Sequence, residues 1–255
     1  MDVGGAGHLV WARQTGADGR PGPGVRVFRS GSAVAVAAPG LSGRDRIAVS
    51  GRTEDALPLV QDVLAETGPT YRPFGDAALI DALVRGIPGL VSGPGAFLWM
   101  ETAEPPGPVT GVEWLDRDGE RRARALFDLC FPDSYAQPGL PGVRRWAGAD
   151  GGALAVAADA WSAADCGFVA GVVTHPHARG RGLGAAVSRF VLDALVRRHG
   201  RAALMVDATN TAAIAVYERA GMRGRLFGAA GWGDDRGGHD GSLMSPSAVK
   251  EPRAC

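Results

Sequence analysis

Residues 168–185 read FVAGVVTHPHARGRGLGA, and this stretch decides the fold of the second half of the chain. Residues 168–174 are apolar or small and predict a buried strand. A loop with alternating glycines follows, and it leads into a helix whose apolar residues recur every three or four positions. Those residues are Leu183, Val187, Phe190, Val191, Ala194 and Leu195, and Gly200 is expected to end the helix.

The glycine-rich loop has the features of an anion site. The first N–H groups of a helix lack partners within the helix, and the helix dipole places about half a positive charge there. Gly180, Gly182 and Gly184 carry no side chain, so a phosphate can approach these N–H groups closely. Arg179 and Arg181 add positive charge around the same loop. We therefore expect a pyrophosphate as the ligand.

Other phosphate-binding loops fit the sequence less well. A Walker loop needs a lysine, and the only lysine in the chain is Lys250. A dinucleotide fold needs the spacing G-x-G-x-x-G with an acidic residue about 20 positions on. The chain has G-x-G-x-G at residues 180–184, although Asp207 lies at a suitable distance. On this loop alone, a purely structural glycine-rich turn stays open.

A second pattern follows directly in the sequence. Residues 202–206 predict a strand, and Asn210 or Thr211 can cap a short helix that ends at Gly221. The spacing Asn210-x-x-Ala213-x-x-x-Tyr217-x-x-x-Gly221, placed after Arg179-x-x-Gly182-x-Gly184, resembles the GNAT superfamily of acyl-CoA-dependent N-acyltransferases. The resemblance covers roughly residues 109–232. It rests on two motifs in the correct order.

The resemblance implies a set of site residues. Backbone groups of Val172, Val173 and Thr174 would bind the pantetheine arm in a gap between two splayed parallel strands, and the Val173 N–H would serve as the oxyanion donor. The pyrophosphate would bind to Arg179, Gly180, Arg181, Gly182, Leu183 and Gly184. Asn210 would form a hydrogen bond with the cosubstrate acetyl-CoA. Tyr217 would protonate the leaving thiolate, and a phenol with a pKa near 10 can donate a proton at neutral pH.

The sequence offers no clear general base. Family members that acetylate protein N-termini often have a Glu five residues before the Asn, where this chain has Met205. Asp207 would face the same side of the strand, two residues further on. The remaining carboxylates in this half fit solvated or capping positions better: Glu113, Asp133, Asp159 and Asp165. Ordered water is the alternative, since the amine needs to lose only one proton.

Two further features suggest chemistry but find a simpler explanation. His175 and His177 flank Pro176 and could hold a metal, but the family has a turn here, so we expect exposed loop histidines and no metal. Cys166 could be a nucleophile, but no activating partner is evident in the sequence. Direct attack by an amine on the thioester needs no such nucleophile.

The pattern of elements predicts an α/β fold with a mixed α+β sheet in two halves. Residues 1–105 form a smaller N-terminal α/β domain, residues 109–232 form the GNAT domain, and residues 233–255 form a polar, mobile tail. The proline-rich stretch 104–108 separates the halves. The N-terminal half lacks both motifs, and it is either a degenerate GNAT-like repeat or an unrelated α+β cap. The predicted elements are strands 25–28, 33–36, 46–49, 96–100, 112–115, 145–146 and 153–158, and helices 53–66, 76–85 and 120–129, the first capped by Thr53.

Composition limits the possible functions. The chain has 255 residues with 27 Lys plus Arg and 27 Asp plus Glu, and this zero net charge argues against a nucleic-acid partner. Its 3 cysteines show no CxxC pair, so neither a disulfide framework nor a zinc site is supported. No signal peptide or run of roughly 18 apolar residues is present, so we expect a cytoplasmic protein that does not bind membranes.

The leading hypothesis is acyl transfer from acetyl-CoA to a primary amine, carried by a small molecule or a peptide. The alternative is a non-catalytic acyl-CoA-binding regulatory module. It is favoured by the absent Glu and disfavoured by the presence of both Asn210 and Tyr217. A nicotinamide enzyme is a third possibility, which would bind NAD instead of CoA.

Overall fold

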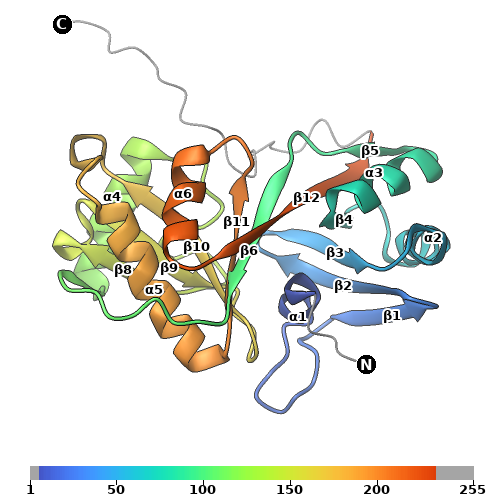
Figure 1. Ribbon diagram of the computed structural model, residues 1–255, viewed down its shortest axis with the longest axis horizontal. Coiled ribbons are helices and arrows are strands. Elements are labelled where there is room, and N and C mark those ends of the chain that lie inside the picture. The colour runs from blue at the N-terminus through green and yellow to red at the C-terminus, as the bar shows by residue number, and fades with distance from the viewer. Residues whose placement is uncertain (1–5, 234–255) are drawn as a thin grey trace, which may run out of the picture.

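The protein was analysed as a computed structural model that describes residues 6–233 (Figure 1). The helices are α1 (Gly7–Ala12), α2 (Thr53–Thr67), α3 (Ala77–Gly86), α4 (Arg117–Cys130), α5 (Leu183–His199) and α6 (Thr211–Arg219), with 3-10 turns η1 (Asp150–Gly152) and η2 (Pro176–Ala178). The first six strands are β1 (Arg26–Ser30), β2 (Ala33–Leu41), β3 (Arg44–Ser50), β4 (Arg72–Asp76), β5 (Leu90–Ser92) and β6 (Phe97–Thr102). The others are β7 (Val112–Trp114), β8 (Val143–Ala149), β9 (Ala155–Ala160), β10 (Gly167–Thr174), β11 (Ala202–Asp207) and β12 (Arg223–Trp232). Apart from Gly233, the predicted tail lies outside the described residues.

One mixed sheet runs through both halves of the molecule. Its strand order is β1-β2-β3-β4-β12-β6-β11-β10-β9-β8-β7, and β5 pairs with β12 beside this path. The neighbours β3 and β4 are parallel, as are β10 and β11. The remaining neighbours are antiparallel. The predicted α/β class with a mixed sheet is therefore confirmed.

The strand order is symmetric about its central pair, β12 and β6. Outward from the centre, β4, β3, β2 and β1 on one side correspond to β11, β10, β9 and β8 on the other, with the same pattern of parallel and antiparallel neighbours. Each half has a helix between its two parallel strands, α2 in one and α5 in the other. Each also has a short helix after the second of these strands, α3 or α6.

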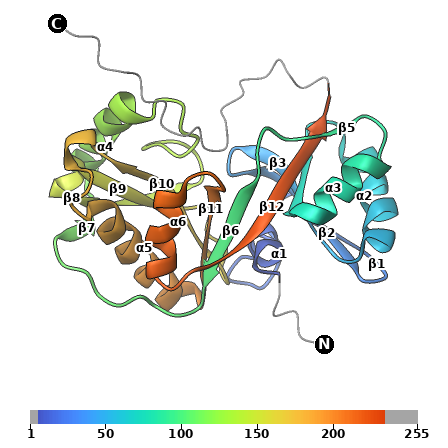
Figure 2. The same ribbon diagram turned by 45° about the horizontal axis from the view of Figure 1, so that its top comes forward.

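The two halves exchange their last strands. β6 follows α3 in the chain, but it pairs with β11 of the other half, at Thr102 with Ala202 through to Phe97 with Asp207. β12 follows α6, yet it pairs with β4 and β5 of the first half. The two exchanged strands also pair with each other, and Figure 2 shows them crossing the centre of the molecule side by side. Residues 103–111 between the halves form no helix or strand.

A cluster of aromatic residues packs across this junction. Trp11 of α1 lies 4.3 Å from the Phe168 ring of β10 in a stacked arrangement, and the Trp99 ring of β6 lies 5.5 Å from Trp11. Trp11, Trp99 and Phe168 are fully buried, so the junction is part of the hydrophobic core. Separate apolar clusters lie under α2 and α3 and under α5 and α6. Within residues 6–233, none of the helices combines the length and apolar character that crossing a membrane requires.

Several elements were absent from the sequence-based prediction: α1, β4, β5 and β12. β4 contains Pro73 and Gly75, which disfavour a strand in isolation. β12 has glycines at 224, 228 and 231 and a weak alternation of apolar residues. Long-range pairing within the sheet stabilises both strands in spite of their local composition.

Helix boundaries also differ from those predicted. Thr53 is the first residue of α2 and not its cap, because Arg52 occupies the N-cap position without a capping side chain. α4 begins at Arg117, since Asp116 caps it by accepting a hydrogen bond from the Gly119 N–H. The strand predicted at 145–146 extends over 143–149 as β8.

Candidate functional site

The parallel strands β10 and β11 separate after a short paired segment. Only Gly167 and Phe168 of β10 are in register with Ala202 and Ala203 of β11. Further along, β10 continues its pairing with β9, while residues up to Asp207 of β11 pair with β6. The backbone of β10 beyond Phe168 is thus directed away from β11. This gives the gap between two parallel strands that the pantetheine arm is expected to occupy.

A β-bulge in β10 marks the point of separation. The register with β9 shifts between Ala170 and Val173, and Gly171 has a φ of 60°. A Cβ at Gly171 would lie 2.5 Å from the Trp146 ring, so a larger residue does not fit there. Val172 lies within the bulge, and pairing with β9 resumes at Val173 and Thr174.

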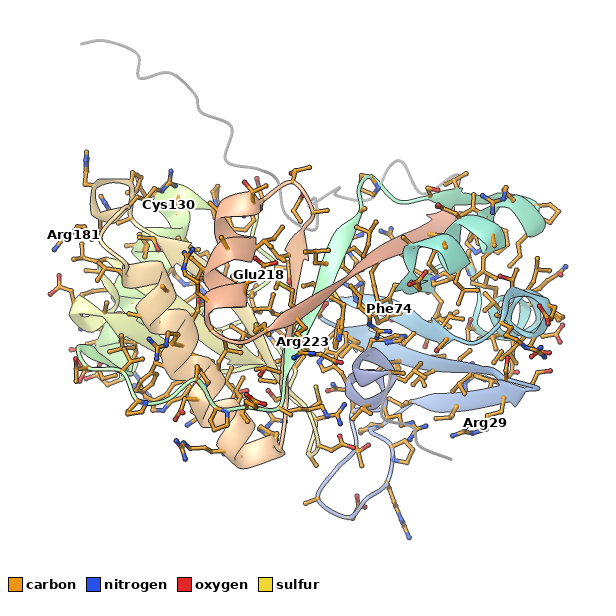
Figure 3. All side chains as sticks on the ribbon, viewed as in Figure 1. Arg29, Phe74, Cys130, Arg181, Glu218 and Arg223 are labelled. Carbon is orange, nitrogen blue, oxygen red and sulfur yellow. The ribbon has the colours of Figure 1, made fainter. Side chains whose placement is uncertain are left out.

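The loop after β10 ends in an open helix N-terminus. Gly180 and Gly182 have φ values of 74° and 78°, and a Cβ at either would meet no heavy atom within 4 Å. Gly182 is the N-cap of α5 and no side chain caps the helix, so its first N–H groups face the loop. Arg179 and Arg181 are both exposed, and Figure 3 shows Arg181 at the outer edge of the molecule.

The third loop glycine has a different role. A Cβ at Gly184 would lie 2.9 Å from the Thr174 hydroxyl, so Gly184 lets the end of β10 pack against the first turn of α5. The Ser188 hydroxyl donates a hydrogen bond to the Gly184 carbonyl at 2.8 Å. The Thr174 side chain therefore lies against the first turn of α5, which includes Leu183.

Asn210 occupies the N-cap of α6, which resolves the choice between Asn210 and Thr211. Its side-chain oxygen accepts a hydrogen bond from the Ala213 N–H at 3.1 Å. This contact uses the side-chain oxygen and leaves the amide N–H₂ group as the available donor.

Tyr217 lies on the buried face of α6, 5% exposed. Burial raises the pKa of its phenol well above the usual range, the nearby Tyr135 raises that pKa further, and a hydrogen bond with Ser188 acts in the opposite direction. The phenol is therefore protonated throughout the neutral range. Through Ser188, Tyr217 is linked to the first turn of α5, so the structure brings Gly184, Ser188 and Tyr217 together.

The carboxylates considered as a base are either engaged in other contacts or exposed. Asp207 accepts hydrogen bonds from the Thr209 N–H and hydroxyl at 2.7 and 2.6 Å and so stabilises the turn before α6. Asp159 is buried against Ser162 and Arg145. Met205 is 8% exposed and packs in the central aromatic cluster. Glu113, Asp133 and Asp165 are exposed.

The histidine and cysteine candidates are accounted for without a catalytic role. The His175 ring accepts a hydrogen bond from the His177 N–H at 3.2 Å, which stabilises the turn after β10. No group of three or more His, Cys, Asp or Glu side chains suited to a metal occurs in residues 6–233. Cys166 is fully buried, and burial raises the pKa of its thiol to about 12, which disfavours the nucleophilic thiolate.

Two neighbours of this site could not be placed from the sequence. Ser188 was hidden on the buried face of an otherwise regular amphipathic helix. Tyr135 lies in the irregular loop after α4, with its ring 5.5 Å from Trp161, and it affects the pKa of Tyr217. The only available signal was a tyrosine within a loop, which does not show what the side chain contacts.

Comparison with known proteins identifies a matching family model and similar solved structures. Residues 113–222 match the family model described as the Acetyltransferase (GNAT) family. A GCN5-related N-acetyltransferase from Kribbella flavida is similar in structure with a TM-score of 0.58 and 19% identity, over 91% of this chain and 97% of that one. A protein from Novosphingobium aromaticivorans assigned to the GNAT family has a TM-score of 0.52 and 21% identity, over 88% and 96%. No curated protein matches the chain. At these identities the structural likeness establishes the fold, and it extends over both halves of the chain.

Proposed function

Because residues 113–222 belong to the GNAT acetyltransferase family, we propose that the protein transfers an acetyl group from acetyl-CoA to a primary amine. The observation that supports this most is the coincidence of three features at one end of β10. These are the separated strands, the uncapped N-terminus of α5 and the buried, protonated Tyr217.

The N–H groups of residues 180–184 bind the pyrophosphate, and Arg179 and Arg181 contribute charge at its outer side. Val172 and Thr174 offer backbone groups to the pantetheine arm, whereas the backbone groups of Val173 pair with Val156 of β9. The amide of Asn210 donates to the same arm while its oxygen caps α6. These contacts direct the thioester along the gap between β10 and β11, toward α6.

The acceptor is the free amine of a small molecule or a peptide, and its nitrogen attacks the thioester carbonyl carbon directly. A backbone N–H of β10 that faces the gap stabilises the negative charge that develops on the carbonyl oxygen. Because the His175 N–H donates to Leu154 next to β9, the alternation of the ladder directs the Val173 N–H to Val156 of β9, which leaves Val172 or Thr174 for this role in place of Val173. As the new C–N bond forms and the C–S bond breaks, Tyr217 donates its proton to the leaving sulfur. The proton that the amine loses passes to ordered water, because Asp207 and Asp159 are engaged in other contacts.

The N-terminal half is, we infer, a degenerate repeat of the same unit. The symmetric strand order and the matching positions of helices support this reading. Asp76 caps α3 as Asn210 caps α6, and the residue seven positions later is Leu83 in α3 and Tyr217 in α6. Since the repeat has a leucine in place of the phenol, we assign one catalytic site to each chain.

A thiol-release assay with acetyl-CoA and a panel of amines tests this proposal. Turnover with at least one amine is expected, and Tyr217→Phe should lower kcat about tenfold or more with little change in CoA affinity. Tyr71→Phe, which removes a phenol from the N-terminal half, is the matched control and should leave kcat unchanged. Tight CoA binding without turnover of any amine would favour a regulatory module instead.

A further inference from the structure

Arg46 of β3 is a buried cation without a carboxylate partner. It is 2% exposed. Its Nε atom donates a hydrogen bond to the Leu41 carbonyl at 3.0 Å, and its Nη2 atom donates to the Ser42 hydroxyl at 2.9 Å. The Arg46 Cζ atom also lies over the Phe74 ring, 5.7 Å from its centre. All three neighbours are neutral, and within residues 6–233 the guanidinium forms no ion pair.

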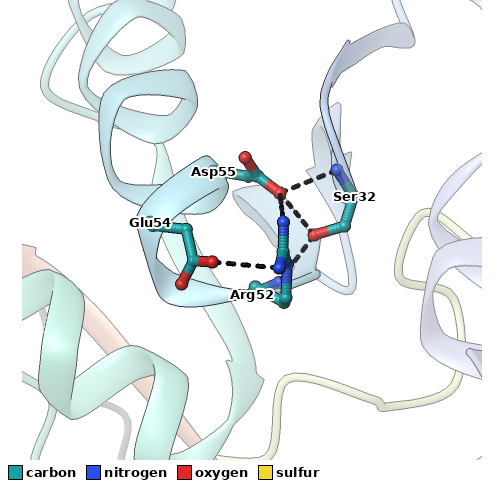
Figure 4. A network of polar contacts seen from close by, with 4 residues as sticks. All are labelled: Ser32, Arg52, Glu54 and Asp55. Carbon is teal, nitrogen blue, oxygen red and sulfur yellow. Dashed lines mark hydrogen bonds and ion pairs between the residues drawn. The ribbon is translucent and has the colours of Figure 1, made fainter.

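An exposed arginine of the same half shows the usual arrangement. Arg52 forms ion pairs with Glu54 at 3.1 Å and Asp55 at 3.4 Å, and Asp55 also accepts hydrogen bonds from Ser32 (Figure 4). Burying a charge without such a partner is unfavourable, because the lost hydration is not replaced. Burial lowers the pKa of Arg46 to about 10, so its guanidinium remains charged at neutral pH. The described residues therefore leave this buried charge without a counter-charge.

One nitrogen of Arg46 is available to a ligand. The Nη1 atom has no hydrogen-bond partner among the described residues, and it is not fully enclosed by protein atoms. After burial, the groups that act most strongly on the pKa of Arg46 are Tyr135, Arg44 and Arg72, and none of them is a carboxylate. An acidic group that approaches Nη1 would therefore meet no competing carboxylate among these neighbours.

The loop between α4 and β8 connects Arg46 with the proposed acetyl-transfer site. Tyr135 in this loop lies against the turn between β2 and β3, since a Cβ at Gly43 would be 4.0 Å from the Tyr135 Cβ atom. The next residue, Ala136, is fully buried, and its carbonyl oxygen would lie 3.1 Å from a Cβ at Gly171 in the β10 bulge. The loop therefore reaches from the turn that accepts hydrogen bonds from Arg46 to the point where β10 separates from β11.

Tyr135 lies between Arg46 and the proposed proton donor. Besides the larger effect of burial, the Tyr135 phenol raises the pKa of both Arg46 and Tyr217, so it lies near both side chains. Tyr135 packs against the central aromatic cluster, which includes Val173 and Met205, whereas Tyr217 belongs to the cluster under α5 and α6. The side of the gap opposite α5 and α6 therefore has Tyr135 in its wall, with Arg46 next to it.

We propose that the acceptor amine carries a carboxylate group and that Arg46 binds this group through Nη1. The inference rests on the proposed acetyl transfer. The acceptor enters from the side of the gap opposite α5 and α6, and Arg46 donates charge-assisted hydrogen bonds to its carboxylate. Because Tyr135 lies between Arg46 and Tyr217, the amine and the carboxylate are separated by more than the single carbon of an α-amino acid. A flat carboxylate is preferred to a bulkier acid, since Arg46 is only 2% exposed.

Steady-state kinetics of the full chain with acetyl-CoA and matched amines test the inference. The panel contains ω-amino acids of increasing length, each with its primary amide, which has the same amine but no negative charge. KM should be about tenfold or more lower for the best amino acid than for its amide. Arg46→Gln should raise KM for that amino acid about tenfold and leave kcat and the KM of the amide unchanged. Arg29→Gln, which removes an exposed charge from β1 at the outer edge of the same half (Figure 3), is the matched control and should change neither KM.

A second measurement needs no variant of Arg46. A carboxylic acid of the same length without the amine should inhibit the wild-type protein competitively against the amino acid, and the amide of that acid should inhibit about tenfold less strongly.

Three results would overturn the inference while leaving acetyl transfer intact: equal KM values for amino acids and their amides, an equal rise in both KM values in Arg46→Gln, or no competition by the carboxylic acid. Turnover of no amine at all would instead contradict the proposed function, and the inference would fall with it.

Discussion

Individual glycines in the loop before α5 differ in what they do. Gly182 has a positive φ and open space around it, whereas Gly184 is required by the close approach of Thr174. The sequence predicted that all three glycines serve one purpose, phosphate access. It could not separate access from packing, because the contact between Thr174 and Gly184 depends on how β10 is placed against α5. The resemblance predicts roles for Gly182, Asn210 and Tyr217, but it gave no sign of Ser188 or Tyr135 beside Tyr217.

Replacing Gly182 by valine should weaken CoA binding at least tenfold, because the side chain blocks the approach of phosphate to the N–H groups of α5. Gly200→Val is the matched control. Gly200 caps the other end of α5 with a φ of 76°, and it also has open space around it. Both variants should lose about 1–2 kcal/mol of stability from the left-handed backbone. Calorimetry with CoA should show weaker binding only for Gly182→Val, and equal weakening in both variants would contradict the loop assignment.

The raised pKa of Tyr217 predicts the pH dependence of the reaction. The pKa of Tyr217 in the folded protein lies above the value of about 10 that it has in the unfolded chain. The phenol in the folded protein therefore keeps its proton at pH 10 and loses it only when the pH rises through the folded-state pKa. The proton donor is thus present at every pH below about 10. The kcat profile should show no fall that depends on Tyr217 in this range. A fall in kcat as pH rises through about 10, absent in Tyr217→Phe, would show that the phenol titrates at its usual pKa and would contradict this prediction.

At the scale of elements, the spacing of apolar residues predicted the helices and strands that have a continuous apolar pattern, such as α5 and β10. Strands with proline and glycine, β4 and β12, were missed because long-range pairing stabilises them. α1 was missed as well, since it has only six residues and is held mainly by burial of Trp11 and His8. The separation of β10 from β11 came only from the resemblance to a known family.

The N-terminus of α6 allows capping and ligand binding to be separated. Asn210→Asp keeps an oxygen to accept from the Ala213 N–H but removes the amide donor, so stability should stay near that of the wild type while CoA affinity falls. Asn210→Ala should lose about 1 kcal/mol of stability as well as affinity. Thermal unfolding and CoA titration of both variants give the two quantities. Full CoA affinity in Asn210→Asp would show that Asn210 is only a cap.

At the scale of the whole molecule, the exchange of β6 and β12 makes one sheet of two halves. The sequence predicted two halves with a boundary near residues 104–108, and the chain does lack regular structure there. It could not predict the exchange, because strand pairing between residues as far apart as Phe74 and Ala229 leaves no local pattern.

The exchange predicts how fragments behave. A fragment of residues 109–232 lacks β6, the neighbour of both β11 and β12, and should fail to fold into a stable structure. A fragment of residues 95–232 retains β6 and should be more stable in thermal unfolding followed by circular dichroism. The full chain should unfold in a single calorimetric transition, since the aromatic cluster and the sheet cross both halves. Two separate transitions would show that the halves are independent.

The most direct test of the central claim is a crystal structure of the protein with CoA. The account predicts pyrophosphate oxygens within hydrogen-bonding distance of the N–H groups of residues 180–184 and the sulfur atom beside the Tyr217 phenol. CoA bound elsewhere, or a glycine-rich loop that stays empty at saturating CoA, would contradict it.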